Sequence, residues 1–126
     1  MKQTYHLGLL YLIHLLISAD GVIDEHEQIA LHNIKEREGI PDELFNAFEG
    51  IVLNKKEREI FETGIDLVNQ CTLEEKLNIF VLLYKLSEVD GRVHVKEIRF
   101  LLYTIKLLGV EFDDVVNKAR TLPSLI

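Results

Sequence analysis

Cysteine and proline are scarce in this 126-residue chain, and each shortage excludes a class of protein. Because Cys71 is the only cysteine, no intramolecular disulfide and no thiolate metal cluster can form, which suits a reducing cytoplasm. The chain holds only 2 Pro and 7 Gly while nearly half of its residues are apolar, so extended disordered segments are not expected. We therefore expect a compact globular protein in the cytoplasm.

Positive charge is also in short supply. The chain has 14 Lys and Arg against 21 Asp and Glu, a net charge of −7, and most of the acidic surplus lies in residues 1–50. Since proteins that bind nucleic acids present clusters of Lys and Arg to the phosphate backbone, we expect no DNA or RNA partner.

The chain repeats itself instead. The stretch around Asp20-Gly21 returns 70 positions later around Asp90-Gly91. Seven residues match without a gap, in that Leu12, Leu16, Asp20, Gly21, Glu27, Leu31 and Gly39 fall on Leu82, Leu86, Asp90, Gly91, Glu97, Leu101 and Gly109. Two separate domains of about 60 residues would each bury too little surface. We therefore expect one domain over 1–126, with an internal repeat of 4–53 and 72–122 and a linking helix over 54–70.

No apolar run is long enough to cross a bilayer, which takes about 20 apolar residues. The run Leu7–Ile17 is interrupted by His14, and with Lys2 before it and Ser18-Ala19 after it the run has the outline of a secretory signal. The repeat favours a buried helix, because the same apolar pattern returns inside the chain, where no signal can act. We expect no direct membrane insertion.

The spacing of apolar residues predicts helices throughout. Thr4–Ala19 and the segment after Thr72 are apolar nearly all round, and an Asp-Gly pair follows each. Gly39 and Pro41 separate two amphipathic helices, and Thr72 with Glu75 has the spacing of a capping box. The prediction is an all-α fold, a seven-helix single domain made of two pseudo-symmetric helical halves around two central apolar helices.

We call the two Asp-Gly stretches, residues 18–27 and 88–97, the hinges. Each hinge resembles the second half of a calcium-binding EF-hand loop. With Gly21 or Gly91 at the loop's sixth position, Asp, an aliphatic residue and Glu fall where the loop has them. The first position, which needs Asp, is Leu16 in one copy and Leu86 in the other. The hinges are therefore not EF-hands.

The hinge acids are still oxygen donors held close by a tight turn, which suits a hard cation such as Ca²⁺ or Mg²⁺. The candidate ligands are Asp20, Asp24, Glu27, Asp90 and Glu97. In the second copy His94 replaces Asp24 and basic residues surround it, so the first copy is the better candidate. The same residues also suit a purely architectural role as helix caps and turn formers, and both interpretations stay open.

Catalytic patterns do not stand out. No histidine follows a Glu at the spacing of di-iron carboxylate bundles, and there is no nucleophile elbow or phosphate loop. His6, His14 and His32 lie on or beside apolar stripes, which favours packing roles, and Cys71 is expected to be a buried, inert thiol. We do not expect an enzyme.

The doubled pattern Asp-Gly-x-(Ile/Val)-x-x-x-Glu, each copy between an apolar and an amphipathic helix, resembles the TerB-like family associated with tellurite resistance. The resemblance covers essentially the whole chain. It implies a bacterial all-helical domain of two pseudo-symmetric halves, a link to stress responses, and a divalent-metal site at Asp20, Asp24, Glu27, Asp90 and Glu97. A similar domain precedes the J-domain of some membrane-anchored co-chaperones. Tellurite itself is not an expected ligand, because an anion would meet an acidic surface.

Two functional hypotheses follow. In the first, the chain is a non-enzymatic accessory module of a tellurite-resistance-related stress response that binds a divalent cation through its hinges. In the second, it is a co-chaperone-like protein-protein interaction or dimerisation module whose hinge acids only cap helices. Both imply a protein partner, and a second copy of the chain would serve as one.

Overall fold

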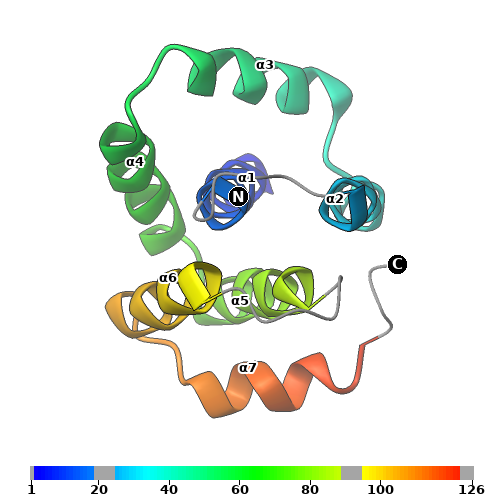
Figure 1. The fold of residues 1–126 in the computed structure, drawn as a ribbon, viewed down its shortest axis with the longest axis vertical. Coiled ribbons are helices and arrows are strands. Elements are labelled where there is room, and N and C mark those ends of the chain that lie inside the picture. The colour runs from blue at the N-terminus through cyan, green and yellow to red at the C-terminus, as the bar shows by residue number, and fades with distance from the viewer. Residues whose placement is uncertain (1, 19–24, 89–94, 123–126) are drawn as a thin grey trace.

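The computed structural model describes residues 2–18, 25–88 and 95–122, and within these ranges the chain forms seven α-helices and no strand (Figure 1). The helices are α1 (Lys2–Ser18), α2 (Glu25–Glu38), α3 (Asp42–Leu53), α4 (Glu57–Asn69), α5 (Leu73–Ser87), α6 (Val95–Leu107) and α7 (Phe112–Ala119). The all-α prediction is confirmed, and α4 lies within the segment 54–70. None of the described helices has the length and apolarity that a membrane crossing requires.

Helix α1 occupies the centre of the molecule. In Figure 1 it is seen nearly end-on, with α2, α3, α4 and α5 around it. From Leu9 to Ile17 its side chains are buried on every side except at half-buried His14, because apolar residues occupy the whole circumference of the helix. Burying each of its Leu and Ile side chains contributes roughly 1.5–3 kcal/mol to folding. α5, whose residues Ile79–Leu83 are also fully buried, packs against it.

Helix α4 packs closely against α1, and two glycines permit it. A Cβ atom on Gly8 would lie 3.0 Å from Val68 Cγ2, and one on Gly64 would lie 3.0 Å from Tyr11 Cβ. These separations are shorter than ordinary carbon–carbon contacts of about 3.5–4.0 Å. Glycine at both positions therefore sets how near the two helices come.

The helices that follow the two hinges end in the same way. Gly39 has a φ of 66° and Gly109 a φ of 75°, the left-handed conformation that favours glycine. The next amide, that of Ile40 or Val110, donates back to a carbonyl of the preceding helix at 3.0 and 3.1 Å, respectively. The predicted stops at the end of α2 and α6 are confirmed, at positions 70 residues apart.

The third helix of each copy packs differently. α7 lies closely along α5, where the rings of Tyr84 and Phe112 meet edge to face with centroids 5.9 Å apart. α3 meets α1 largely through Phe48, whose ring centroid lies 5.0 Å from that of Tyr11 and 6.1 Å from that of His14. α3 and α7 flank the core on opposite sides of the molecule (Figure 1).

Candidate functional site

Two of the five predicted cation ligands lie within the described structure, and three do not. Glu27 is the third residue of α2 and Glu97 is the third residue of α6. Asp20, Asp24 and Asp90 lie outside the described residues, as does His94. The structure therefore gives one acidic ligand candidate from each copy, at the same position of its helix.

Both glutamates are buried. The exposed fraction is 2% for Glu27 and 0% for Glu97, whereas their helix neighbours Glu25 and Lys96 are exposed. Glutamate is almost never fully buried unless it is paired, because removing a carboxylate from water costs several kcal/mol or more. The third position of α2 and α6 therefore turns its carboxylate into the protein rather than towards solvent, in both copies.

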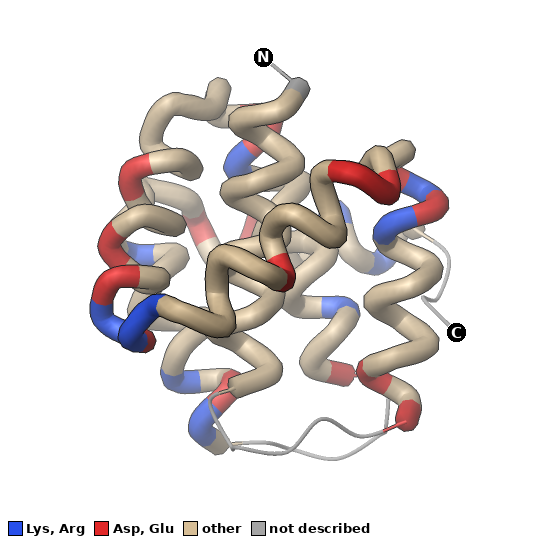
Figure 2. Tube along the Cα trace, turned by 90° about the horizontal axis from the view of Figure 1, so that it is seen from above, with Lys and Arg blue, Asp and Glu red and all other residues tan. Residues whose placement is uncertain are grey.

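The helix ends that flank the two hinges lie at one end of the molecule, the lower end in Figure 2. Acidic positions elsewhere, red in the same view, are spread over several helices, with basic positions, blue, among them. Within residues 2–18, 25–88 and 95–122, no three His, Cys, Asp or Glu side chains are grouped so that they could hold a metal ion. A cation site at the hinges stays a prediction that depends on Asp20, Asp24 and Asp90.

A second polar cluster, which the sequence analysis missed, joins three helices. The Tyr5 hydroxyl of α1 donates to Glu38 Oε1 of α2 at 2.6 Å, and Asn78 of α5 donates its side-chain amide to Tyr5 and, at 3.4 Å, to Glu38 Oε1. His6 Nε2 lies 3.0 Å from the Glu38 carbonyl oxygen. Burial, followed by the hydrogen bond and charge of Glu38, raises the pKa of Tyr5, so the hydroxyl keeps its proton and donates.

A departure from the repeat could have revealed this cluster. Seventy positions after Glu38 stands Leu108, which is buried, and seventy before Asn78 stands Gly8. An acid where the other copy has a buried leucine indicates a polar partner nearby, since a half-buried carboxylate requires hydrogen bonds. The partners themselves are not visible in sequence, because Tyr5 and Asn78 are far apart along the chain.

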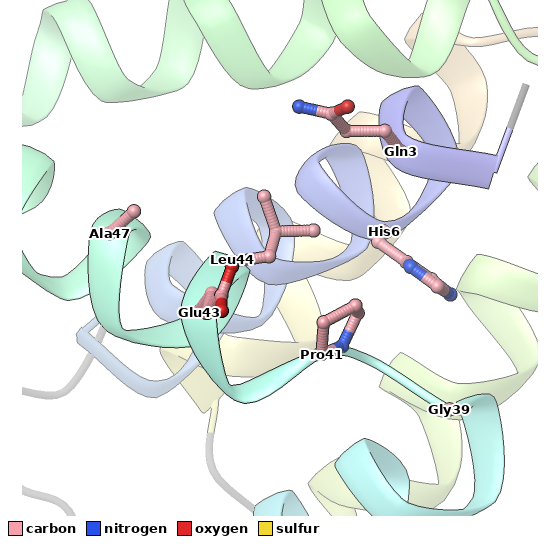
Figure 3. Close-up of a pocket in the computed structure, with 7 residues that line it drawn as sticks. All are labelled: Gln3, His6, Gly39, Pro41, Glu43, Leu44 and Ala47. Carbon is pink, nitrogen blue, oxygen red and sulfur yellow. The ribbon is translucent and has the colours of Figure 1, made fainter.

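Beside this cluster an open groove of about 510 Å³ runs between the start of α1 and the turn from α2 to α3. Figure 3 shows His6 and Gln3 on the α1 side, with Pro41, Leu44 and Glu43 across from them. His6 is buried, and its Nε2 atom is engaged with Glu38. The groove is thus bordered by a histidine that has a structural role.

The packing roles predicted for His14 and His32, and the inert thiol predicted for Cys71, agree with the structure in some cases and not in others. His14 is half-buried against Phe48, as expected of a packing residue. The prediction is wrong for His32, whose side chain is 66% exposed and lies 3.9 Å from Glu36 one helical turn away. His32 stands next to an apolar stripe without belonging to it. The Cys71 thiol is half-buried and burial raises its pKa, which favours the protonated, inert form.

Comparisons with curated proteins and with solved structures gave no match. The model of one protein family, described as tellurite resistance protein TerB, matches residues 6–120. That range contains α2 to α7 entirely and all but the first turn of α1. The match agrees with the resemblance carried by the doubled Asp-Gly motif, and the chain belongs to the TerB family.

Proposed function

We propose that this chain is a non-enzymatic accessory module of a bacterial stress response related to tellurite resistance. The observation that carries the proposal is the family match over residues 6–120, which spans nearly the whole fold. A match of this extent covers the sequence of α2 to α7 and most of α1 rather than one short motif. The single cysteine is in keeping with work in a reducing cytoplasm.

The second part of the proposal is a divalent cation at the hinges. Asp20, Asp24 and Glu27 are the first set of ligands, and Asp90 and Glu97 belong to the second copy. The burial of Glu27 and Glu97 at the same helical position supports a shared role, and all the donors are carboxylate oxygens, which favour Ca²⁺ or Mg²⁺. The flanking helix ends lie on one side of the molecule, which supports pooling of ligands from both copies.

The two hinges also imply an architecture. We propose that residues 4–53 and 72–122 form two pseudo-symmetric halves joined by α4. The left-handed backbone of both Gly39 and Gly109, and the matching helical positions of Glu27 and Glu97, support this arrangement. A cation held between the halves would then fix how they sit on one another.

The cation is tested by titrating Ca²⁺, Mg²⁺, Mn²⁺ and Zn²⁺ into the protein while the amide signals of Gly21 and Gly91 are followed by NMR. Millimolar Ca²⁺ or Mg²⁺ is expected to shift both signals, and the double variant Asp20→Asn with Asp90→Asn is expected to lose the response. Absence of any shift in the unchanged protein contradicts the cation. The wider role is tested separately, by comparing the tellurite tolerance of cells that carry and lack the protein.

The alternative, an interaction or dimerisation module, is favoured by the outer face of α6. Tyr103 is 60% exposed and Leu107 48% exposed, and the Tyr103 ring lies 6.2 Å from that of Phe61 on α4. Exposed groups of large apolar side chains mark protein-binding surfaces. Under this alternative the hinge acids only cap helices. The double variant Asp20→Asn with Asp90→Asn then changes the stability of the fold, and added metal affects neither the variant nor the unchanged protein. The partner is then a protein, and a second copy of the chain is tested by sedimentation of the Tyr103→Ser variant.

A further inference from the structure

A small apolar cavity of about 120 Å³ lies between α1, α2 and α3. Its walls include Leu10 and Ile13 of α1, Leu31 of α2, and Phe45 and Phe48 of α3. Leu10, Ile13 and Phe48 are buried, and Leu31 and Phe45 are partly buried against the core. For comparison, an apolar cavity of about 150 Å³ holds a benzene molecule.

Two polar residues, His14 and Glu49, complete the lining. Burial lowers the pKa of the His14 imidazole, against the opposing effect of the Glu57 carboxylate, so the ring is neutral near pH 7. A neutral imidazole offers one hydrogen-bond donor and one acceptor. The Glu49 carboxylate, which is exposed, disfavours an anion at the same edge. The cavity is therefore suited to a neutral molecule with one hydrogen-bonding group.

At two lining positions the second copy of the repeat has bulkier side chains, whereas at others it has smaller ones, such as Val115 for Phe45 and Ser87 for Ile17. Seventy residues after Leu10 stands Phe80, which is fully buried, and seventy after His14 stands Tyr84. In that copy α7 packs closely along α5, and the Tyr84 ring meets Phe112. Leu10 and His14 are thus lining positions at which the first copy has the smaller side chain.

We propose that the cavity between α1, α2 and α3 binds one small neutral aromatic molecule of about the size of phenol, with its hydroxyl at His14 and its ring against Phe45 and Phe48. Aromatic rings pack favourably edge to face at centroid separations of about 4.5–7 Å, which suits a ring packed beside these phenylalanines. This ligand site is separate from the hinges and does not depend on the cation.

The test is a titration of the whole chain with phenol and with benzene, followed by NMR of side-chain methyl groups. Saturable shifts of the Leu10, Ile13 and Leu31 methyls are expected with both ligands. Nuclear Overhauser effects from the phenol ring to the Leu10 and Leu31 methyls place the ligand in the unchanged protein without any variant. Absence of saturable shifts with both ligands, or effects only at other methyls, overturns the proposal.

The repeat supplies the variant that fills the cavity. Leu10→Phe introduces the residue that the second copy has at this position, and it is expected to abolish phenol binding. Leu53→Phe makes the same change at a side chain that is 83% exposed, and it is expected to bind phenol as the unchanged protein does. Thermal unfolding by circular dichroism checks that both variants are folded. Folded Leu10→Phe protein with undiminished phenol binding contradicts the proposal.

The polar end of the cavity is tested with His14→Phe. Loss of one hydrogen bond is expected to weaken phenol binding roughly two- to tenfold, while benzene, which forms none, binds as before. Equal effects on phenol and benzene would remove His14 from the proposed contact with the hydroxyl.

Discussion

The Tyr5 hydroxyl donates a 2.6 Å hydrogen bond to Glu38 Oε1 and thereby joins the start of α1 to the end of α2. Tyr5→Phe removes this donor and leaves the carboxylate without it in a half-buried place. Hydrogen bonds to charged groups are worth about 1.5–3 kcal/mol, so we expect a loss of that order in the free energy of unfolding. Urea denaturation at pH 7 measures it. Unchanged stability would show that water replaces the tyrosine without cost.

The same residue makes stability depend on alkaline pH. Because the pKa of Tyr5 is raised in the folded protein above its ordinary value of 10.0, the unfolded chain loses this proton first as the pH rises. The contribution is present in full below pH 10 and declines above it. We expect the unchanged protein to lose more stability than Tyr5→Phe between pH 9 and pH 11. Parallel curves for the two proteins would contradict the assignment, since their other tyrosines are the same.

Replacement by alanine is expected to have opposite effects at two helical glycines, Gly64 at the contact between α4 and α1 and Gly50 on α3. Gly64→Ala places a methyl group 3.0 Å from Tyr11 Cβ and is expected to cost about 1–3 kcal/mol of stability. Gly50→Ala in α3 meets nothing within 4 Å and is expected to stabilise the protein by roughly 0.5–1 kcal/mol, since alanine favours a helix interior. Thermal or urea unfolding of both variants provides the comparison, and a stabilised Gly64→Ala protein would show that the helices can move apart.

The proposed cation predicts unequal effects of the two buried glutamates. Saturating Ca²⁺ is expected to raise the unfolding temperature of the unchanged protein. The free energy of unfolding is expected to rise by about 2.7 kcal/mol when the free cation is at 100 times its Kd. Glu27→Gln is expected to lose more of this increment than Glu97→Gln, because basic residues surround the second hinge. Calorimetry with saturating Ca²⁺, and with EDTA in excess over the metal, measures this increment for each protein. Identical increments in both variants would refute the preference for the first copy.

The helices and their ends are predictable because their signals are local. Thr72 and Glu75 form the expected capping box, in which the Glu75 amide donates to Thr72 Oγ1 at 3.1 Å and the Thr72 amide donates to Glu75 Oε1 at 2.9 Å. Both groups lie within one helical turn, so spacing alone identifies them. The stops at Gly39 and Gly109 are local in the same sense.

Contacts between distant segments were not predictable. Nothing near Tyr5 in the sequence identifies Glu38 or Asn78 as its partners, and the cavity beside Phe48 depends on how far α3 stands from α1. The candidate ligands likewise have some features that are predictable from sequence and others that are not. The spacing placed Glu27 and Glu97 correctly in the first turns of their helices, but their burial follows from tertiary packing. His32 shows the limit of periodicity, since a residue one step from an apolar stripe faces solvent.

The central position of α1 also has a consequence for synthesis. Its main packing partners α4 and α5 come later in the chain than α2 and α3, so its apolar surface lacks most of its native cover until residues 57–87 have been made. At cellular rates of about 5–20 residues per second this interval lasts on the order of several seconds. A nascent chain in this condition exposes an apolar helix of the kind that holdase chaperones bind.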